Sequence, residues 1–237
     1  MTWLLTNDDG ITAPGLKALV QSLPADLGEE IVIVAPMEEQ SGCGHQVTTH
    51  RSIHIKKVDP ALFERVDRAF AIAGTPADCI RVALHHLGEE VTFVCSGINA
   101  GGNLGVDIYM SGTVAAVREA AFYGIPGMAL SQYRRGPVTI DWARATALAQ
   151  GAISKLLTHP LERGQFWNVN FPHLDLVDAP LPEAILCPNC TQPMPCEFSH
   201  QGDFLAYQGN YGGRSQVLDT DVAVCFGGHI AATQLTI

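Results

Sequence analysis

The alternation of short apolar runs with amphipathic segments is the feature that most limits how this chain can fold. Residues 31 to 36, IVIVAP, form an unalternating apolar run, which is typical of a strand covered on both faces of a parallel sheet. Residues 14 to 23 before it repeat leucine and valine at helical spacing, and residues 3 to 6 form an earlier apolar run. A strand, a helix and a second strand in this order predict a βαβ unit.

A further strand and helix are predicted within residues 70 to 87. The apolar start of this segment indicates a strand, and Thr75 follows it as a helix N-cap with Pro76 at the first helical position. Asp78 stands three residues after Thr75, the spacing of a capping box. The helix therefore begins at a position fixed by three neighbouring side chains.

The same alternation continues to residue 171 and defines the fold class. Strands are predicted in VTFVC, IPGMALS and FWNVNFP, and helices in SGTVAAVREAAFYG and over residues 142 to 157. RSIHIKKV, residues 51 to 58, alternates like an exposed strand or hairpin arm. The sequence therefore predicts an α/β fold, a Rossmann-like, doubly wound and mostly parallel sheet, over residues 1 to 171.

Residues 172 to 237 have a different pattern. Proline, cysteine and glycine are frequent, and the apolar pieces are short. We expect a C-terminal extension of β-hairpins and loops. It has too few apolar residues at helical spacing to form its own core. We therefore expect it to supply much of the contact in a homo-oligomer.

The charge of the chain limits its partners. The formal net charge is -10 at pH 7, which disfavours a nucleic-acid polymer or an anionic membrane as the main partner. The N-terminus lacks a basic leader and no apolar run is long enough to span a bilayer, so we expect a cytoplasmic protein. In that compartment the seven cysteines are expected to be reduced.

Two adjacent carboxylates follow the first predicted strand in LLTNDDGI. Asp8 and Asp9 repel each other, and Gly10 permits a turn that would bring both to one centre. Polar, glycine-containing loops also follow the strands at residues 31 to 36 and 91 to 95, and such loops meet at the carboxyl edge of a parallel sheet. The pair is either a turn with a helix cap or, with these loops, part of a cation site.

Five segments resemble the SurE family of survival proteins in order and spacing. They are TNDDGITAPG, QSGCGH, AGTPADCIRVAL, SGINAGGNLGVD and SGTVAAVREAAFYGIPGMALS, and NVNFP and TDVAVCFGGHIAATQL resemble later family landmarks more loosely. The resemblance implies a metal-dependent phosphatase of nucleoside 5'- and 3'-monophosphates, with short polyphosphate as a substrate of some members. It also implies dimers or tetramers with exchanged C-terminal elements.

The resemblance also implies which residues hold the metal. By motif position the ligands are Asp8, Asp9, Ser41 and Asn99, and Asp8 and Asp9 are then the catalytic pair. All four are oxygen donors, which favour one Mg²⁺ or Mn²⁺ per subunit over zinc.

A phosphate dianion needs further donors, because two carboxylates nearly neutralise a divalent ion. Asn103 and the segment Ser111, Gly112 and Thr113, at the start of a predicted helix, are the candidates. The alternative is that Ser111 or Thr113 only caps the helix. Met110 stands directly before this segment, where family members usually have an aromatic or polar residue.

Other functions compete with a SurE-like phosphatase. A haloacid-dehalogenase-type phosphatase uses an Asp nucleophile in a D-x-D pair, whereas the carboxylates here are adjacent. G-x-G-x-x-G and G-x-S-x-G are both absent, which disfavours a dinucleotide enzyme and a serine hydrolase. A non-catalytic nucleotide or metal sensor would need the same ligands and stays an alternative.

Two further features have no assigned role. His45 follows a predicted ligand and is as well explained by structure as by function. Cys187, Cys190 and Cys196 contain one pair at zinc spacing, and free thiols are the preferred interpretation.

Overall fold

The computed structural model describes residues 1–174 and 180–237. Its centre is a nine-stranded sheet with the strand order β3-β4-β2-β1-β5-β6-β7-β11-β8. The six strands from β4 to β7 in this order run parallel; they are β1 (Thr2–Thr6), β2 (Glu30–Pro36), β4 (Arg68–Ile72), β5 (Val91–Asn99), β6 (Gly127–Gln132) and β7 (Gln165–Phe171). The predicted doubly wound, mostly parallel sheet is therefore confirmed.

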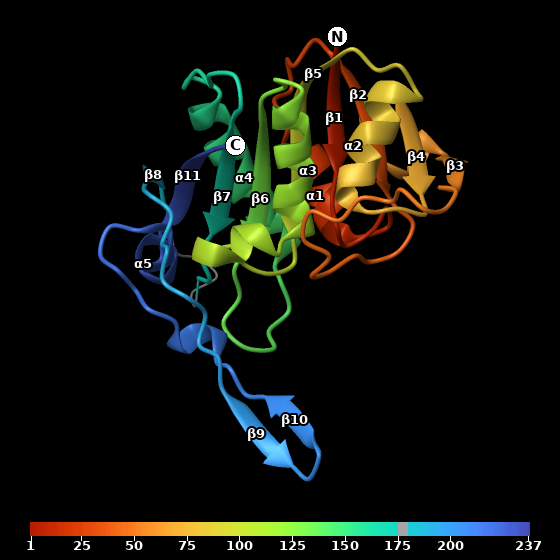
Figure 1. The fold of residues 1–237 in the computed structure, drawn as a ribbon. Helices are drawn as coiled ribbons and strands as arrows, with labels where there is room; N and C mark the ends of the chain where they lie inside the picture. Colours follow the sequence, from red (N-terminus) through yellow and green to blue (C-terminus); the bar gives the residue numbers. More distant parts are fainter. Residues whose placement is uncertain (175–179) are drawn as a thin grey trace.

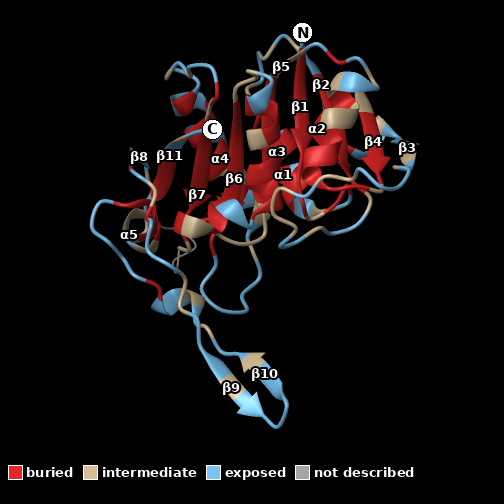
Figure 2. Cartoon of the chain, in the orientation of Figure 1, coloured by how far each residue is buried: buried red, intermediate tan, exposed pale blue. Residues whose placement is uncertain are grey.

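Four helices cover the two faces of this sheet (Figure 1). They are α1 (Pro14–Ser22), α2 (Pro76–His85), α3 (Gly112–Phe122) and α4 (Trp142–Leu156). Apolar side chains of α1 and α4 pack on one face and those of α2 and α3 on the other. Neighbouring residues of a strand point to opposite faces, so Leu5 belongs to the first core and Leu4 to the second. Both cores are buried, as the red sheet in Figure 2 shows.

The caps of α2 and α4 show why these helices begin where they do. Thr75 accepts a hydrogen bond from the Asp78 N–H at 3.2 Å, and Asp78 Oδ2 accepts one from the Thr75 N–H at 3.0 Å. The predicted capping box is thus confirmed. Asp141 caps α4 by accepting from the Arg144 N–H at 3.0 Å. Each cap satisfies N–H groups that the helix itself leaves unpaired.

Two strands differ in extent from the sequence prediction. The exposed strand expected over residues 51 to 58 is confirmed as the edge strand β3, but it covers only Ile55–Val58, antiparallel to β4. The strand predicted in VTFVC continues to Asn99, so the SGIN segment is the end of β5 rather than a loop. Asn99 is therefore held by the sheet itself.

The C-terminal region extends the sheet and projects a hairpin away from it. β11 (Ile230–Thr236) pairs antiparallel to β7, and β8 (Ala184–Leu186) pairs parallel to β11. The expected hairpin is present as β9 (Phe198–Gln201) and β10 (Phe204–Tyr207), which stand clear of the main body in Figure 1. Residues 175–179, near the start of the predicted extension, lie outside the described residues.

The described residues also contain a short helix, α5 (Asp221–Phe226), and three 3₁₀ turns. The turns are Pro60–Leu62, Gly105–Tyr109 and Tyr211–Gly213. Within the described residues, every helix lacks the length and apolar character that crossing a membrane requires.

Candidate active site

The predicted site segments meet in one cavity at the carboxyl end of the central strands. Its volume is about 530 Å³. The residues that line it come from the ends of β1 and β5, the loop after β2, the segment before α3 and the loop after β6; they are Asp8, Asp9, Glu39, Ser41, Gly42, Asn99, Ala100, Gly101, Asn103, Asp107, Met110, Ser111 and Arg134. Open α/β proteins bind their ligands at the carboxyl edge of the parallel sheet, and the predicted residues lie at this edge.

Asp8 lies buried at the start of α3. Gly10 has a φ of +100°, a left-handed conformation that suits glycine and turns the chain just after the acidic pair. The Thr113 hydroxyl donates a hydrogen bond of 2.6 Å to Asp8 Oδ1. A Cβ atom on Gly112 would lie 3.0 Å from the Asp8 Cβ, so the absence of a side chain there lets the helix approach the carboxylate.

Asp8 is also a carboxyl group with a perturbed pKa. Burial raises the pKa of Asp8 to about 6, against the lowering effect of the Thr113 hydrogen bond, and the charge of Asp9 raises it as well. The negative charges of Asp8 and Asp9 repel each other unless a positive charge lies between the two carboxylates.

Asp9 is half-buried and lies next to the backbone of Ala100. The Ala100 N–H donates to Asp9 Oδ2 at 3.2 Å. Burial raises the pKa of Asp9; the Ala100 hydrogen bond opposes this, Glu39 adds to it, and the positive charge of Arg134 opposes it. Asp9 is therefore held by a backbone donor and faces both acidic and basic neighbours.

Ser41 and Asn99 each keep an oxygen atom for a ligand. The Asn99 Nδ2 group donates to the Gly101 carbonyl at 2.9 Å, so the carboxamide oxygen is the atom left to bind a cation. The Ser41 hydroxyl donates to Glu39 Oε1 at 2.7 Å, and its oxygen retains lone pairs. Four oxygen donors, from the loops after β1 and β2 and from the end of β5, fit the coordination preference of Mg²⁺ or Mn²⁺.

Asn103 is fixed by three polar side chains beneath it. Its N–H donates to Asn170 Oδ1 at 2.7 Å, and its carbonyl accepts from the Nδ2 groups of Asn168 and Asn170 at 2.8 and 3.0 Å. Its own Nδ2 donates to the Ser131 hydroxyl at 2.8 Å. The NVNFP segment of β7 thus holds the loop that carries Asn103 over the strand ends.

Ser111 is the N-cap of α3. Its hydroxyl oxygen accepts from the Val114 N–H at 3.1 Å, and its hydroxyl proton stays available for a second bond. The direct phosphate contacts expected of Ser111, Gly112 and Thr113 remain predictions; the contact present at the Thr113 hydroxyl is the one with Asp8.

Three charged residues at the cavity had no assigned role in the sequence analysis. Glu39 lies in the loop after β2, and Arg134 is an exposed side chain that follows β6. Asp107 Oδ2 accepts from Arg214 Nη1 at 2.6 Å and from the Tyr211 hydroxyl at 2.7 Å. The C-terminal region thereby braces the segment between Asn103 and Ser111. Of these three residues, only Glu39 could have been noticed from the sequence, because it lies close to the predicted ligand Ser41.

His45 and the cysteines are not among the predicted metal ligands. His45 Nε2 lies 2.7 Å from Glu119 Oε2 and ties the glycine-rich loop to α3. Cys187 and Cys190 are buried and Cys196 is exposed. Over residues 1–174 and 180–237, no group of three or more His, Cys, Asp and Glu side chains is placed to hold a metal ion.

The fold and the cavity define a class of protein: an open α/β fold with paired carboxylates at the carboxyl edge of its sheet and an oxygen-rich site around them. A sequence model of the family described as "Survival protein SurE" matches residues 3–191. The chain belongs to the SurE family.

Individual relatives agree with this assignment. A Nostoc sp. protein named "Putative 5'-nucleotidase alr3139" is 51% identical over 237 residues, which is 100% of both chains. A protein of Burkholderia lata named "5'-nucleotidase SurE 1" is 41% identical over 171 residues, 71% of this chain and 63% of the relative. The crystal structure of the SurE protein from Aquifex aeolicus matches with a TM-score of 0.82 at 29% identity, over 100% of this chain and 93% of that one.

Proposed function

We propose that this protein is a 5'-nucleotidase, a phosphomonoesterase that releases phosphate from nucleoside 5'-monophosphates. The observation that carries the proposal is the setting of Asp8 and Asp9 in one cavity, with Asp8 bonded to Thr113 at the start of α3. The names of the relatives and membership of the SurE family support the same activity. Nucleoside 3'-monophosphates belong to the proposed substrates as well.

One divalent ion per subunit, Mg²⁺ or Mn²⁺, belongs to this proposal. Asp8, Asp9, Ser41 and Asn99 would hold it through their oxygen atoms. When bound, such an ion offsets charge that develops on the phosphoryl oxygens and lowers the pKa of a water molecule.

The residues of the chain then have separate tasks. Thr113 fixes the orientation of Asp8, so that the carboxylate does not need to reorganise during the reaction. Asn103, Ser111 and the N–H groups at the start of α3 bind phosphate oxygens, as helix N-termini do. Arg134 contributes a positive charge to a cavity in which carboxylates are otherwise in excess.

The proposed chemistry is attack by water rather than by a side chain. The water oxygen forms a bond to phosphorus and gives up one proton, the bond from phosphorus to the nucleoside oxygen breaks in line with it, and the leaving oxygen takes up one proton. The contacts of Asp8 disfavour the alternative mechanism in which this aspartate attacks phosphorus. Its Oδ1 atom accepts a hydrogen bond from Thr113, and its side chain is buried. The rival predicts a phosphorylated aspartate that can be trapped.

We also propose a homodimer or homotetramer that uses the C-terminal region. Four large apolar side chains of the projecting hairpin are exposed: Phe198, Phe204, Leu205 and Tyr207. A second copy of the chain is a suitable cover for such a surface. Light scattering at micromolar concentration should give a mass of two or four chains, and a monomer would contradict this part of the proposal. Cytoplasmic location stays a prediction.

The activity itself is tested by phosphate release. The protein is first freed of metal with a chelator and then assayed with adenosine 5'-monophosphate, with and without added Mn²⁺ or Mg²⁺. Phosphate release that requires the metal supports the proposal. Metal and nucleotide binding without any turnover would favour the sensor alternative.

A further inference from the structure

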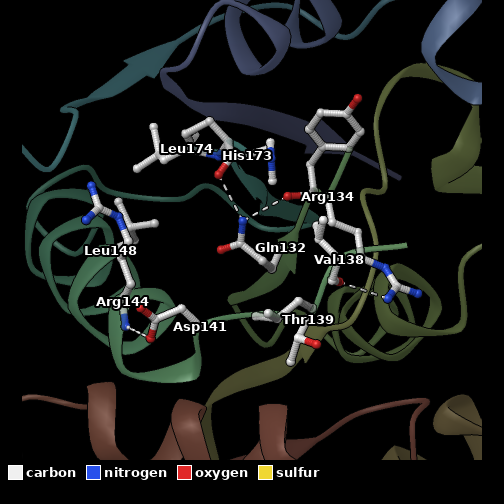
Figure 3. Close-up of a pocket in the computed structure, with 12 residues that line it drawn as sticks. Gln132, Arg134, Val138, Thr139, Asp141, Arg144, Leu148, His173 and Leu174 are labelled. Carbon is white, nitrogen blue, oxygen red and sulfur yellow. Dashed lines mark hydrogen bonds between the residues drawn. The ribbon is translucent and has the colours of Figure 1, made fainter. Parts of the chain in front are cut away.

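A second cavity of about 180 Å³ lies beside the candidate site and is drawn in Figure 3. It is formed at the carboxyl ends of β6 and β7 and at the start of α4. Apolar side chains supply much of its wall: Val138, Ile140, Leu148, Pro172 and Leu174. A closed apolar cavity of about 150 Å³ binds benzene in another protein, so this one has room for an aromatic ring.

Gln132 gives this apolar cavity one oriented polar atom. Its Nε2 group donates to the carbonyls of Tyr133 and Pro172, each at 2.9 Å. Both amide hydrogens are therefore used, and the orientation of the carboxamide is fixed by two carbonyl acceptors. In Figure 3 the Gln132 oxygen points away from these bonds into the cavity.

The Gln132 Oε1 atom is available to accept a hydrogen bond. Gln132 is only 8% exposed, and both hydrogen bonds of its side chain to described residues are donated by its Nε2 group. The carboxamide oxygen therefore keeps its lone pairs, and a ligand that fills the cavity can bind it with an N–H group.

Arg134 connects this cavity to the candidate active site. It lines both cavities, its charge acts on Asp9, and its guanidinium lies 3.4 Å from the Val138 carbonyl at the second cavity. A ligand that passes Arg134 would thus place an anionic end near the acidic pair and a flat ring near Gln132. A nucleoside monophosphate has these two ends.

We propose that the second cavity is the subsite for the nucleobase and that Gln132 Oε1 accepts a hydrogen bond from an N–H group of the base. This inference rests on the proposed nucleotidase function and adds a specificity-determining residue to it. Gln132 acts on the base and takes no part in the chemistry at phosphorus.

Three substrates separate the subsite from the reaction centre. Adenosine 5'-monophosphate has a base with an amino group, purine riboside 5'-monophosphate has a base without any N–H group, and ribose 5-phosphate has no base. The unaltered protein should use the first with a kcat/KM about threefold to tenfold above the second, as expected for one neutral hydrogen bond. Gln132→Leu should make the two equal while leaving ribose 5-phosphate turnover unchanged.

A second variant covers the possibility that Gln132→Leu loosens the ends of β6 and β7. Ile140→Trp keeps Gln132 and fills the cavity, so it should lower kcat/KM for adenosine 5'-monophosphate at least tenfold and spare ribose 5-phosphate. Unchanged use of adenosine 5'-monophosphate by Ile140→Trp, or an unchanged preference in folded Gln132→Leu, would overturn the subsite. Failure of the unaltered protein on all three substrates would instead remove the proposed function, and the subsite with it.

Discussion

The Thr113 hydroxyl donates its hydrogen to Asp8 Oδ1 at 2.6 Å, although the two residues are 105 positions apart in the chain. Both side chains are buried. A short hydrogen bond to a buried carboxylate fixes its rotamer and stabilises its charged form. We therefore expect Thr113 to hold the Asp8 carboxylate in one orientation.

Thr113→Val should weaken metal binding. Valine keeps the shape of threonine but cannot donate, and a hydrogen bond to a charged group contributes roughly 1.5 to 3 kcal/mol. The Mn²⁺ concentration for half-maximal activity should rise about tenfold to a hundredfold. Thr113→Ser, which keeps the hydroxyl, is the control. If the Mn²⁺ dependence of Thr113→Val equals that of Thr113→Ser, the bond to Asp8 has no part in metal binding.

Ser111 should serve both as a cap and as a substrate donor, and two variants separate these roles. Asparagine caps helices about as well as serine, whereas alanine loses about 1 kcal/mol. Ser111→Ala should therefore lower both Tm and kcat/KM, and Ser111→Asn should lower kcat/KM alone. Thermal unfolding and steady-state kinetics on both variants measure this. Parent-like kinetics for Ser111→Asn would leave Ser111 with the capping role only.

Arg134→Ala should raise KM for nucleoside monophosphates. The variant removes a positive charge from the cavity wall, and the loss of one charge-assisted contact corresponds to about a tenfold change or more. Arg135→Ala is the matched control, because it removes the same charge from the next residue, which does not line the cavity. Equal effects of the two substitutions would mean that only the overall charge of the protein matters.

Glu119 should make the stability of the protein depend on pH in the acidic range. Its side chain is buried and accepts hydrogen bonds from His45 Nε2 and Arg81 Nε, each at 2.7 Å. Burial alone would raise the pKa of Glu119, but the hydrogen bonds from His45 and Arg81 outweigh it and hold the pKa below its usual value of 4.5.

A group whose pKa is lower in the folded state stabilises the fold above its unfolded pKa and loses this contribution as pH falls through the folded pKa. Glu119→Gln should therefore lower the free energy of unfolding by roughly 2 kcal/mol at pH 7. The difference from the unaltered protein should shrink below a pH of about 4.5. Urea unfolding at several pH values measures it, and a difference that stays constant on acidification would contradict the role given to this carboxylate.

The parts of the fold that the sequence predicted depend on local signals. The capping box of Thr75 and Asp78 and the unbroken apolar run of β2 each lie within a few residues, so their pattern is visible without the rest of the chain. The end of β5 was missed because SGIN has the composition of a loop, yet Asn99 pairs with Ser131 of the neighbouring strand. Pairing with a distant strand leaves no local pattern.

The same distinction applies to the site. Asp8 and Asp9 could be placed at the carboxyl edge because they directly follow a predicted strand. The hydrogen bonds that hold Asn103 could not be predicted. Asn168 and Asn170 are only polar positions in an otherwise apolar strand until the position of the Asn103 loop is known. Arg134 is exposed in a loop, and only the shape of the cavity gives it a possible role.

The Mn²⁺ dependence of phosphate release by Asp9→Asn tests the central claim most directly. Asparagine keeps the size of the side chain and one oxygen but removes a charge, so metal affinity and activity should fall together, and excess Mn²⁺ should partly restore the rate. If Asp9→Asn stays inactive at every Mn²⁺ concentration while still binding the metal, or if the unaltered protein yields an aspartyl-phosphate on rapid acid quenching, the proposed role of the acidic pair in holding a metal for attack by water is contradicted.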